Sequence, residues 1–155
     1  MTRAYFSLGS NVGDRGAHLA LGVAMMSEDQ PCRVSRVFRS EPVGGVAQDD
    51  FWNLVLEVTT EESPHVLLAR VRATEAAALR TRGVRWGPRS LDVDIIWMDD
   101  VTCDDEELTV PHPRAFERNF VLVPWRELRA DLVSDEDIRR ADGAVQVLGT
   151  LETLH

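Results

Sequence analysis

Lysine is absent from this chain of 155 residues, so all 17 of its basic residues are arginines. This absence excludes a P-loop lysine, a Schiff-base lysine and a lysine general base. The formal net charge is −9, whereas a general nucleic-acid binder needs positive charge to displace counterions. We therefore expect no nucleic acid partner, and any anion that the protein binds must be held by arginine.

Cysteine and long apolar runs are also scarce. The two cysteines, Cys32 and Cys103, lie far apart and outside any metal-ligand spacing, which indicates a reducing compartment and no disulfide framework. No signal-peptide hydrophobic region is present, and no apolar run approaches the length of a membrane span. Since repeats and flexible linkers are missing too, we expect one cytoplasmic domain over residues 1–155, monomeric and without a membrane partner.

The apolar periodicity predicts alternating strands and helices. Period-2 patterns predict strands at residues 4–8, 34–39, 51–59 and 91–98. Helical patterns predict one helix of about 14 residues from near Asp14, and a second from Pro64, capped by Ser63, to about Leu79. The order β-α-β-β-α-β is the ferredoxin-like pattern of an α+β fold, an antiparallel sheet with both helices on one face.

Shorter features complete this prediction. A turn at Gly9, Ser10 and Asn11 should end the first strand. After the core we expect C-terminal additions: a short strand before Pro111, a helix near residues 120–128, and a last segment whose type the sequence leaves open.

Two aspartates interrupt the apolar strand of residues 91–98. Because strand side chains alternate between faces, one face should be wholly apolar, with Leu91, Val93, Ile95 and Trp97. The other should carry Asp92 and Asp94 and then Ile96 and Met98. Carboxylates beside a core need a counter-charge. It could be arginine in ordinary salt bridges, or Mg²⁺, which takes one or two protein carboxylates together with water and phosphate oxygens.

Four arginines precede the acidic strand, at Arg80, Arg82, Arg85 and Arg89. On spacing alone they could form a solvated basic loop. Guanidinium groups, however, bind phosphate oxygens through a planar set of donors. Arginines that lead into paired aspartates therefore favour a site for a polyphosphate–Mg²⁺ complex, built without a P-loop.

Other side chains are candidates with ordinary alternatives. Trp86, between the arginines, either packs beneath the loop or contacts a ligand. His112 is presented rigidly between two prolines, although a structural turn histidine is the simpler interpretation. Phe51 and Asn53 share a strand face and offer a flat ring beside an amide, which suits a planar heterocycle, but Phe51 could also be plain core.

Four segments together resemble one enzyme family. They read LGSNVGDR, EPVGG…FWN, RWGPRSLDVDII and VPHPRAFERNFVLVP, and the resemblance extends over about residues 4–128. In this order they resemble the signature blocks of the 6-hydroxymethyl-7,8-dihydropterin pyrophosphokinases of folate biosynthesis. The resemblance implies transfer of a pyrophosphoryl group from ATP to the hydroxymethyl oxygen of the pterin, with release of AMP. It also implies two Mg²⁺ ions held by Asp92 and Asp94.

The resemblance further implies roles for individual residues. The pterin would be bound by Ser40, Val43, Phe51, Asn53, Asp92 and Phe120, with its ring between the two phenylalanines. The nucleotide would be bound by Glu75, Trp86, Arg89, Ile95, Thr109, His112 and Arg118. Catalysis would depend on Arg80, Arg82, Arg89, Asp92 and Asp94, and no general base is assigned.

Two other functions are alternatives to this one. The first is a catalytically inactive relative that binds ATP or a pterin, which the retention of both aspartates and the aromatic pair disfavours. The second is an RNA-binding or metal-binding module on the same fold. The acidic charge disfavours RNA, and the absence of a Cys/His cluster in the sequence disfavours a transition metal.

Overall fold

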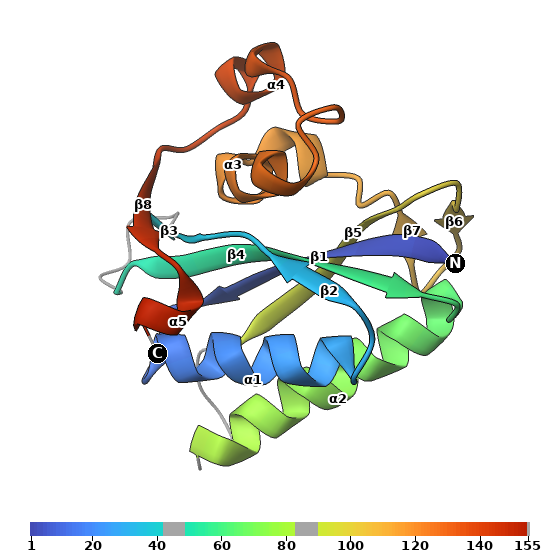
Figure 1. The fold of residues 1–155 in the computed structure, drawn as a ribbon, viewed down its shortest axis with the longest axis horizontal. Helices are drawn as coiled ribbons and strands as arrows, with labels where there is room; N and C mark the ends of the chain where they lie inside the picture. Colours follow the sequence, from blue (N-terminus) through green and yellow to red (C-terminus); the bar gives the residue numbers. More distant parts are fainter. Residues whose placement is uncertain (42–48, 83–89, 155) are drawn as a thin grey trace.

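The computed structural model describes residues 1–41, 49–82 and 90–154, the side chains of residues 80–82 excepted (Figure 1). Its main sheet has the strand order β5-β1-β4-β3-β8, and β2 also pairs with β4. These strands are β1 (Thr2–Ser10), β2 (Cys32–Val34), β3 (Val37–Ser40), β4 (Phe51–Thr60), β5 (Asp92–Met98) and β8 (Val145–Gly149). All the pairings are antiparallel. With helices α1 (Arg15–Ser27) and α2 (Pro64–Arg82) as connections, this is the predicted ferredoxin-like α+β fold.

One face of the sheet packs on α1 and α2 (Figure 1). Alternate residues of β1 and β4, such as Phe6 and Leu56, are buried there together with Leu19 of α1. The helix approaches closely at Gly22, because a Cβ atom at that position would lie 2.6 Å from Cδ2 of Leu8. This layer forms the larger apolar core.

The other face packs on α3 (Asn119–Leu128), with α4 (Asp135–Arg140) further out (Figure 1). Trp125 of α3 is fully buried, and its ring centroid lies 6.0 Å from that of Tyr5 and 5.8 Å from that of Trp97. The sheet is therefore covered on both faces, by the core helices on one and by a C-terminal addition on the other.

In the described part of the chain, no helix is both long and apolar enough to cross a membrane.

The C-terminal segment, whose type the sequence left open, adds the outermost strand. After the small pair β6 (Cys103–Asp104) and β7 (Thr109–Val110), the chain forms a 3-10 helix at Ala115–Glu117, then α3 and α4, and β8 pairs with β3 before α5 (Leu151–Leu154). Asn119 fastens this segment to α3, because its Nδ2 donates to the carbonyl oxygens of Ile138, Ala141 and Gly143 at 3.2, 3.3 and 2.9 Å.

A β-bulge in β5 corrects one sequence prediction. Tyr5 lies opposite Trp97 and Phe6 lies opposite Ile95, so Ile96 is an extra residue without a partner on β1. The alternation of faces therefore changes at Ile96. Met98, not Trp97, joins the core beneath α1 and α2, whereas Ile96 and Trp97 pack on the α3 side. The predicted placement of Trp97 and Met98 is wrong, but the placement of Asp92 and Asp94 beside Ile96 is correct.

Two strand boundaries also differ from the prediction. The strand predicted over residues 34–39 is interrupted, because Val34 lies opposite Leu56 whereas Phe38 lies opposite Asn53, which leaves one extra residue between them. At this break the N–H of Arg36 donates to Oε1 of Glu127 in α3, at 2.9 Å, instead of joining the ladder.

The second boundary concerns the first strand. The sequence predicts a turn at Gly9 and Ser10, but both belong to β1, where they lie opposite Asn53 and Trp52 of β4. Pairing with β5 continues to Gly9 and pairing with β4 to Ser10, so β1 extends past its apolar residues.

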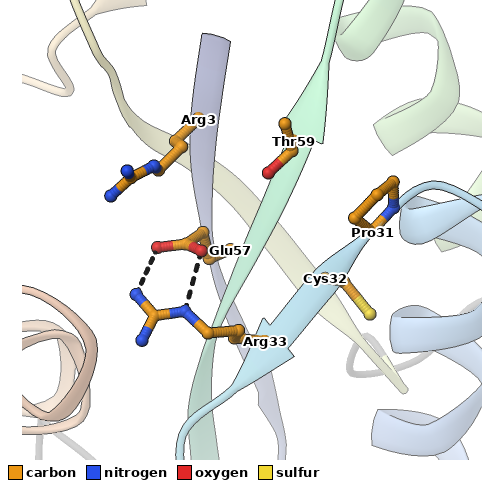
Figure 2. Close-up of a pocket in the computed structure, with 6 residues that line it drawn as sticks. All are labelled: Arg3, Pro31, Cys32, Arg33, Glu57 and Thr59. Atoms are coloured by element: carbon orange, nitrogen blue, oxygen red, sulfur yellow. Dashed lines mark hydrogen bonds and ion pairs between the residues drawn. The ribbon is translucent and has the colours of Figure 1, made fainter. Parts of the chain in front are cut away.

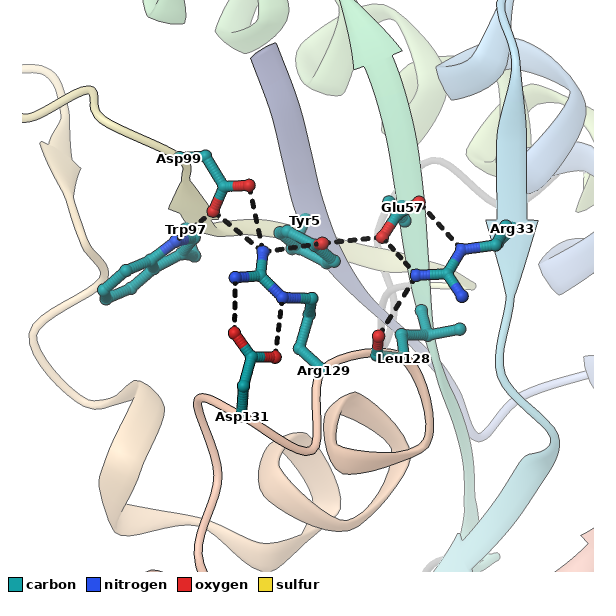
Figure 3. A network of polar contacts seen from close by, with 8 residues as sticks. All are labelled: Tyr5, Arg33, Glu57, Trp97, Asp99, Leu128, Arg129 and Asp131. Atoms are coloured by element: carbon teal, nitrogen blue, oxygen red, sulfur yellow. Dashed lines mark hydrogen bonds and ion pairs between the residues drawn. The ribbon is translucent and has the colours of Figure 1, made fainter.

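A polar network crosses the α3 side of the sheet (Figure 3). The Tyr5 hydroxyl donates to Oε2 of Glu57 at 2.6 Å, and Arg33 binds the same carboxylate through Nε and Nη2 at 2.9 and 2.7 Å. Arg129 donates to the Tyr5 oxygen at 3.0 Å and to both oxygens of Asp99 at 2.8 and 3.0 Å. The hydrogen bonds from Arg33 hold the pKa of the Glu57 carboxyl below its usual value.

Replacing Glu57 by glutamine should destabilise the fold in a pH-dependent way. Because the pKa of Glu57 is lowered in the folded state, its contribution is present above the unfolded value of about 4.3 and is lost as the pH falls through the folded value. We expect a loss of about 1–3 kcal/mol near neutral pH, toward the lower end because Arg33 is half exposed. Urea unfolding of wild type and variant, at a series of pH values from neutral to acid, measures this difference in the free energy of unfolding.

Glu127→Gln is the matched control, since Glu127 also pairs with an arginine, Arg36, but at the surface. It should cost less near neutral pH. A Glu57→Gln deficit that stayed constant into strong acid would contradict the assignment of the effect to the ionised carboxylate.

Candidate active site

The predicted site residues of three strands meet on the α3 side of the sheet, around Gly9. In the register of the sheet, Gly9 lies opposite Asn53 of β4 on one side and Asp92 of β5 on the other. Two residues earlier, Ser7 lies between Val55 and Asp94 in the same way. Neighbouring strands are about 4.8 Å apart, so the backbones of Asn53 and Asp92 are separated by about 10 Å with only a glycine between them.

Asn53 is buried and held in one orientation. Its Nδ2 donates to Oγ of Ser40 at 2.8 Å and to the carbonyl oxygen of Phe38 at 3.3 Å. A Cβ atom on Gly9 would lie 3.1 Å from Oδ1 of Asn53 and 3.7 Å from Cδ1 of Phe51. The amide oxygen and the Phe51 ring therefore both border the space above Gly9. The predicted cluster of Ser40, Phe51 and Asn53 is thus brought together.

The two aspartates border the opposite side of this space. Asp94 is exposed and Asp92 is half-buried, two residues apart on one face of β5. Between them, the N–H of Val93 donates to Oε2 of Glu75 in α2 at 3.0 Å. Glu75, predicted at the nucleotide site, therefore fixes the outer edge of the acidic strand.

His112, Arg118 and Phe120 come from the segment that follows β7. The N–H of His112 donates to the carbonyl oxygen of Ile96 at 3.0 Å, which places this residue along the outer edge of β5. Its Nδ1 accepts from the N–H of Arg114 at 3.1 Å, so a neutral ring carries its proton on Nε2. Arg118 precedes α3, and its guanidinium carbon lies 5.5 Å from the centroid of the Phe120 ring. Among the described residues, no ring contact joins Phe120 to Phe51.

The remaining predicted residues are placed less directly or not at all. The side chain of Ile95 is buried in the core beneath the helices, so only its main chain could reach a ligand. Thr109 is exposed in β7. Outside the described residues lie Val43, Trp86, Arg89 and the side chains of Arg80 and Arg82.

Gly9 and Ser7 border the candidate site but are not among the residues predicted from the sequence. Both lie in or beside the LGSN segment, where the glycine carries the local signal of a turn. Its actual role follows from its two neighbours across the sheet, which no local pattern contains. Ser10, next to it, faces the helix side, where its hydroxyl donates to the carbonyl oxygen of Ser90 at 2.5 Å and fixes the start of the acidic strand.

An open pocket of about 440 Å³ lies elsewhere, toward the other ends of β1 and β4 (Figure 2). It is lined by Arg3, Pro31, Cys32, Arg33, Glu57 and Thr59. None of these residues was predicted at the site, and the carboxylate of Glu57 is already bound by Arg33. This pocket is therefore separate from the candidate site.

The fold is a ferredoxin-like α+β fold, and polar side chains of β3, β4 and β5 gather on one face of its sheet. The model of the 7,8-dihydro-6-hydroxymethylpterin-pyrophosphokinase (HPPK) family matches residues 5–130. The chain belongs to this family.

Individual relatives agree with the family assignment. A 2-amino-4-hydroxy-6-hydroxymethyldihydropteridine pyrophosphokinase of Methylorubrum extorquens is 43% identical over 145 residues, which cover 91% of this chain and 92% of that protein. The protein of the same name from Bacillus subtilis is 41% identical over 81% of this chain and 77% of its own. The chain also matches the bifunctional protein FolKE of Lactococcus lactis at 43% identity, spanning 38% of its length.

A solved structure has the same fold. The chain of a Plasmodium falciparum HPPK-DHPS with SDX-DHP superposes with a TM-score of 0.57 at 15% identity, over 99% of this chain and 43% of that one. At this identity the likeness shows the fold alone.

Proposed function

We propose that this protein transfers a pyrophosphoryl group from ATP to the hydroxymethyl oxygen of 6-hydroxymethyl-7,8-dihydropterin, releasing AMP, at the sheet face around Gly9. Membership in the family, with the names of the relatives, supports a pyrophosphokinase of folate biosynthesis rather than an inactive relative. The observation that carries the location is the register that sets Asn53 and Asp92 on opposite sides of Gly9.

The pterin would lie on the Asn53 side. A planar ring can approach the sheet there because Gly9 has no side chain, and an amide oriented by Ser40 can hydrogen-bond the edge of the heterocycle. Phe51 and Phe120 would stack on the two faces of the ring. Main-chain groups near Val43 would complete the contacts with the ring edge.

The triphosphate would lie on the aspartate side. Asp92 and Asp94 fit Mg²⁺, since they present two carboxylates on one strand face, one exposed and one half-buried. We propose that they hold two Mg²⁺ ions, which when bound would neutralise phosphate charge and polarise the reacting phosphoryl group. The arginines would bind the phosphate oxygens, in place of the missing lysine. This set comprises Arg80, Arg82, Arg89 and Arg118, and His112 and Trp86 would lie beside it. The base and ribose of the nucleotide would be surrounded by Glu75, Ile95 and Thr109.

The reaction then requires mainly positioning. The hydroxymethyl oxygen forms a bond to the β-phosphorus, the bond from that phosphorus to the α,β-bridging oxygen breaks, and the hydroxyl proton is released to solvent. AMP leaves with the bridging oxygen. The space between Asn53 and Asp92 would set the acceptor oxygen beside the β-phosphate, which is the contribution that phosphoryl-type transfer needs most. We further propose that the enzyme is Mg²⁺-dependent and acts as a cytoplasmic monomer formed by one domain.

A nucleotide product assay tests the reaction. The protein is incubated with ATP, Mg²⁺ and the pterin, and AMP is separated from ADP. The proposal expects AMP that appears only with pterin and falls to background when Mg²⁺ is chelated. Pterin-dependent ADP would mean an ordinary phosphoryl transfer, and binding without turnover would favour the inactive relative.

Gly9→Ala should weaken pterin binding about tenfold, because the added Cβ would enter the space beside Asn53 Oδ1 at 3.1 Å. The affinity for Mg-ATP should change little. Gly22→Ala is the matched control, since it crowds Leu8 on the helix side and should lower stability without changing pterin affinity. Isothermal titration calorimetry measures the pterin affinity of both variants. Equal losses of pterin affinity in the two variants would contradict the proposed position of the ring.

A further inference from the structure

Three side chains that bind transition metals meet at the opposite end of β5 from Asp92. They are His65 in the first turn of α2, Cys103 in β6, and Asp105 just after it. One possible ligand atom from each lies within 4.8 Å of the other two. Nε2 of His65 is 2.8 Å from Oδ2 of Asp105, and Sγ of Cys103 is 3.7 Å from the same oxygen. No local sequence pattern predicts this cluster, because His65 is distant from the other two residues along the chain.

The carboxylate of Asp105 is fixed in place. Its Oδ1 accepts from the N–H groups of Glu107 and Leu108, both at 2.9 Å, so its Oδ2 is directed at His65 and Cys103. The hairpin that carries it is closed by the pairing of Cys103 with Val110 and of Asp104 with Thr109. Hydrogen bonds that orient a ligand in this way are typical of the surroundings of protein metal sites.

The local charge favours a cation. Asp104, Asp105, Glu106 and Glu107 are consecutive, and the described residues place only His65 as a basic partner of Asp105. Imidazole, thiolate and carboxylate together are a set of nitrogen, sulfur and oxygen donors. Mg²⁺ prefers oxygen alone, whereas Zn²⁺ takes this mixed set.

We propose that His65, Cys103 and Asp105 form a Zn²⁺ site, with three protein ligands and a fourth position open to water. The site would join the start of α2 to the β6–β7 hairpin, which Figure 1 places near the N-terminus of the chain. That hairpin continues through Pro111 directly to His112, so the metal would also stabilise the segment that leads into the proposed nucleotide site. The proposal does not depend on the pyrophosphokinase reaction.

Cobalt titration of the untagged, reduced protein tests this site, because Co²⁺ replaces Zn²⁺ and gives a near-ultraviolet charge-transfer band only when a thiolate is bound. The expected result is one such band that saturates at one Co²⁺ per chain and disappears on addition of Zn²⁺. Carboxylates such as Asp92 and Asp94 cannot produce it. Cys103→Ser should abolish the band, and His65→Ala should weaken Co²⁺ binding about tenfold or more.

Cys32→Ser is the matched control, because Cys32 is the other free cysteine and is exposed away from this cluster. It should keep the full band. As a second measurement, Zn²⁺ should raise the Tm of wild type and of Cys32→Ser but not that of Cys103→Ser. No band in wild type, or a band that is lost in Cys32→Ser and retained in Cys103→Ser, would overturn the proposal.

Discussion

Asp94→Asn should reduce pyrophosphoryl transfer by about a thousandfold or more while leaving the fold intact. Removing one of two proposed metal-binding carboxylates takes away several kcal/mol of charge stabilisation, and about 1.4 kcal/mol corresponds to a factor of ten in rate. Asp94 is exposed and belongs to neither apolar core, so its replacement should change the free energy of unfolding little. Rates of AMP formation at saturating pterin, with urea unfolding in parallel, measure both quantities.

Asp135→Asn provides the control for this variant, since Asp135 is also an exposed aspartate but lies in α4, where it pairs with Arg126. It should transfer at the wild-type rate. The affinity of Mg-ATP should fall in Asp94→Asn and be unchanged in the control. If Asp94→Asn kept normal turnover, the aspartates of β5 would not hold the catalytic metal, and ordinary salt bridges with arginine would be the better interpretation.

Asn53→Leu should raise the KM for the pterin by about a hundredfold. The change removes the amide beside Gly9 and leaves the hydrogen-bonding edge of a buried heterocycle without a partner, at a cost of about 1–3 kcal/mol for each lost bond. The affinity for Mg-ATP should stay close to that of wild type, because the aspartates are on the other side of Gly9. Steady-state kinetics with each substrate varied in turn separates the two effects.

Asn53→Leu will also lose stability, because the Asn53 amide donates hydrogen bonds to Oγ of Ser40 and to the carbonyl oxygen of Phe38. Glu57→Gln controls for that loss, since it lies on the same face of the same strand, four residues away, and should destabilise without contacting the site. A similar rise in pterin KM in both variants would mean that general loosening of β4, and not a missing contact, explains the result.

The sequence predicted the elements with local signals. Periodicity predicts the order of strands and helices. Ser63 followed by Pro64 predicts the N-terminal cap of α2, and this cap is confirmed because the N–H of Val66 donates to Oγ of Ser63 at 3.4 Å. The pairs Phe51 with Asn53 and Asp92 with Asp94 were placed on common faces because alternation in a strand needs no partner to be known.

Features that depend on a neighbouring strand were not predicted. The bulge at Ile96 reverses the faces of Trp97 and Met98, and it is defined by the register of β5 against β1, which a local pattern does not contain. A glycine in isolation carries the signal of a turn, whereas the strand neighbours of Gly9, Asn53 and Asp92, lie far from it in sequence. The meeting of His65 with Cys103 and Asp105 is likewise a product of the fold.

The proposed reaction requires that pterin and Mg-ATP meet above Gly9, between Asn53 and the two aspartates. A crystal structure of the protein with Mg²⁺, the pterin and an ATP analogue whose α,β-bridging oxygen is replaced by methylene would show whether they do. We expect metal density on Asp92 and Asp94, and the pterin edge against Asn53 with its hydroxymethyl oxygen facing the β-phosphorus. Metal held by other residues, or a pterin bound away from Gly9, would contradict it.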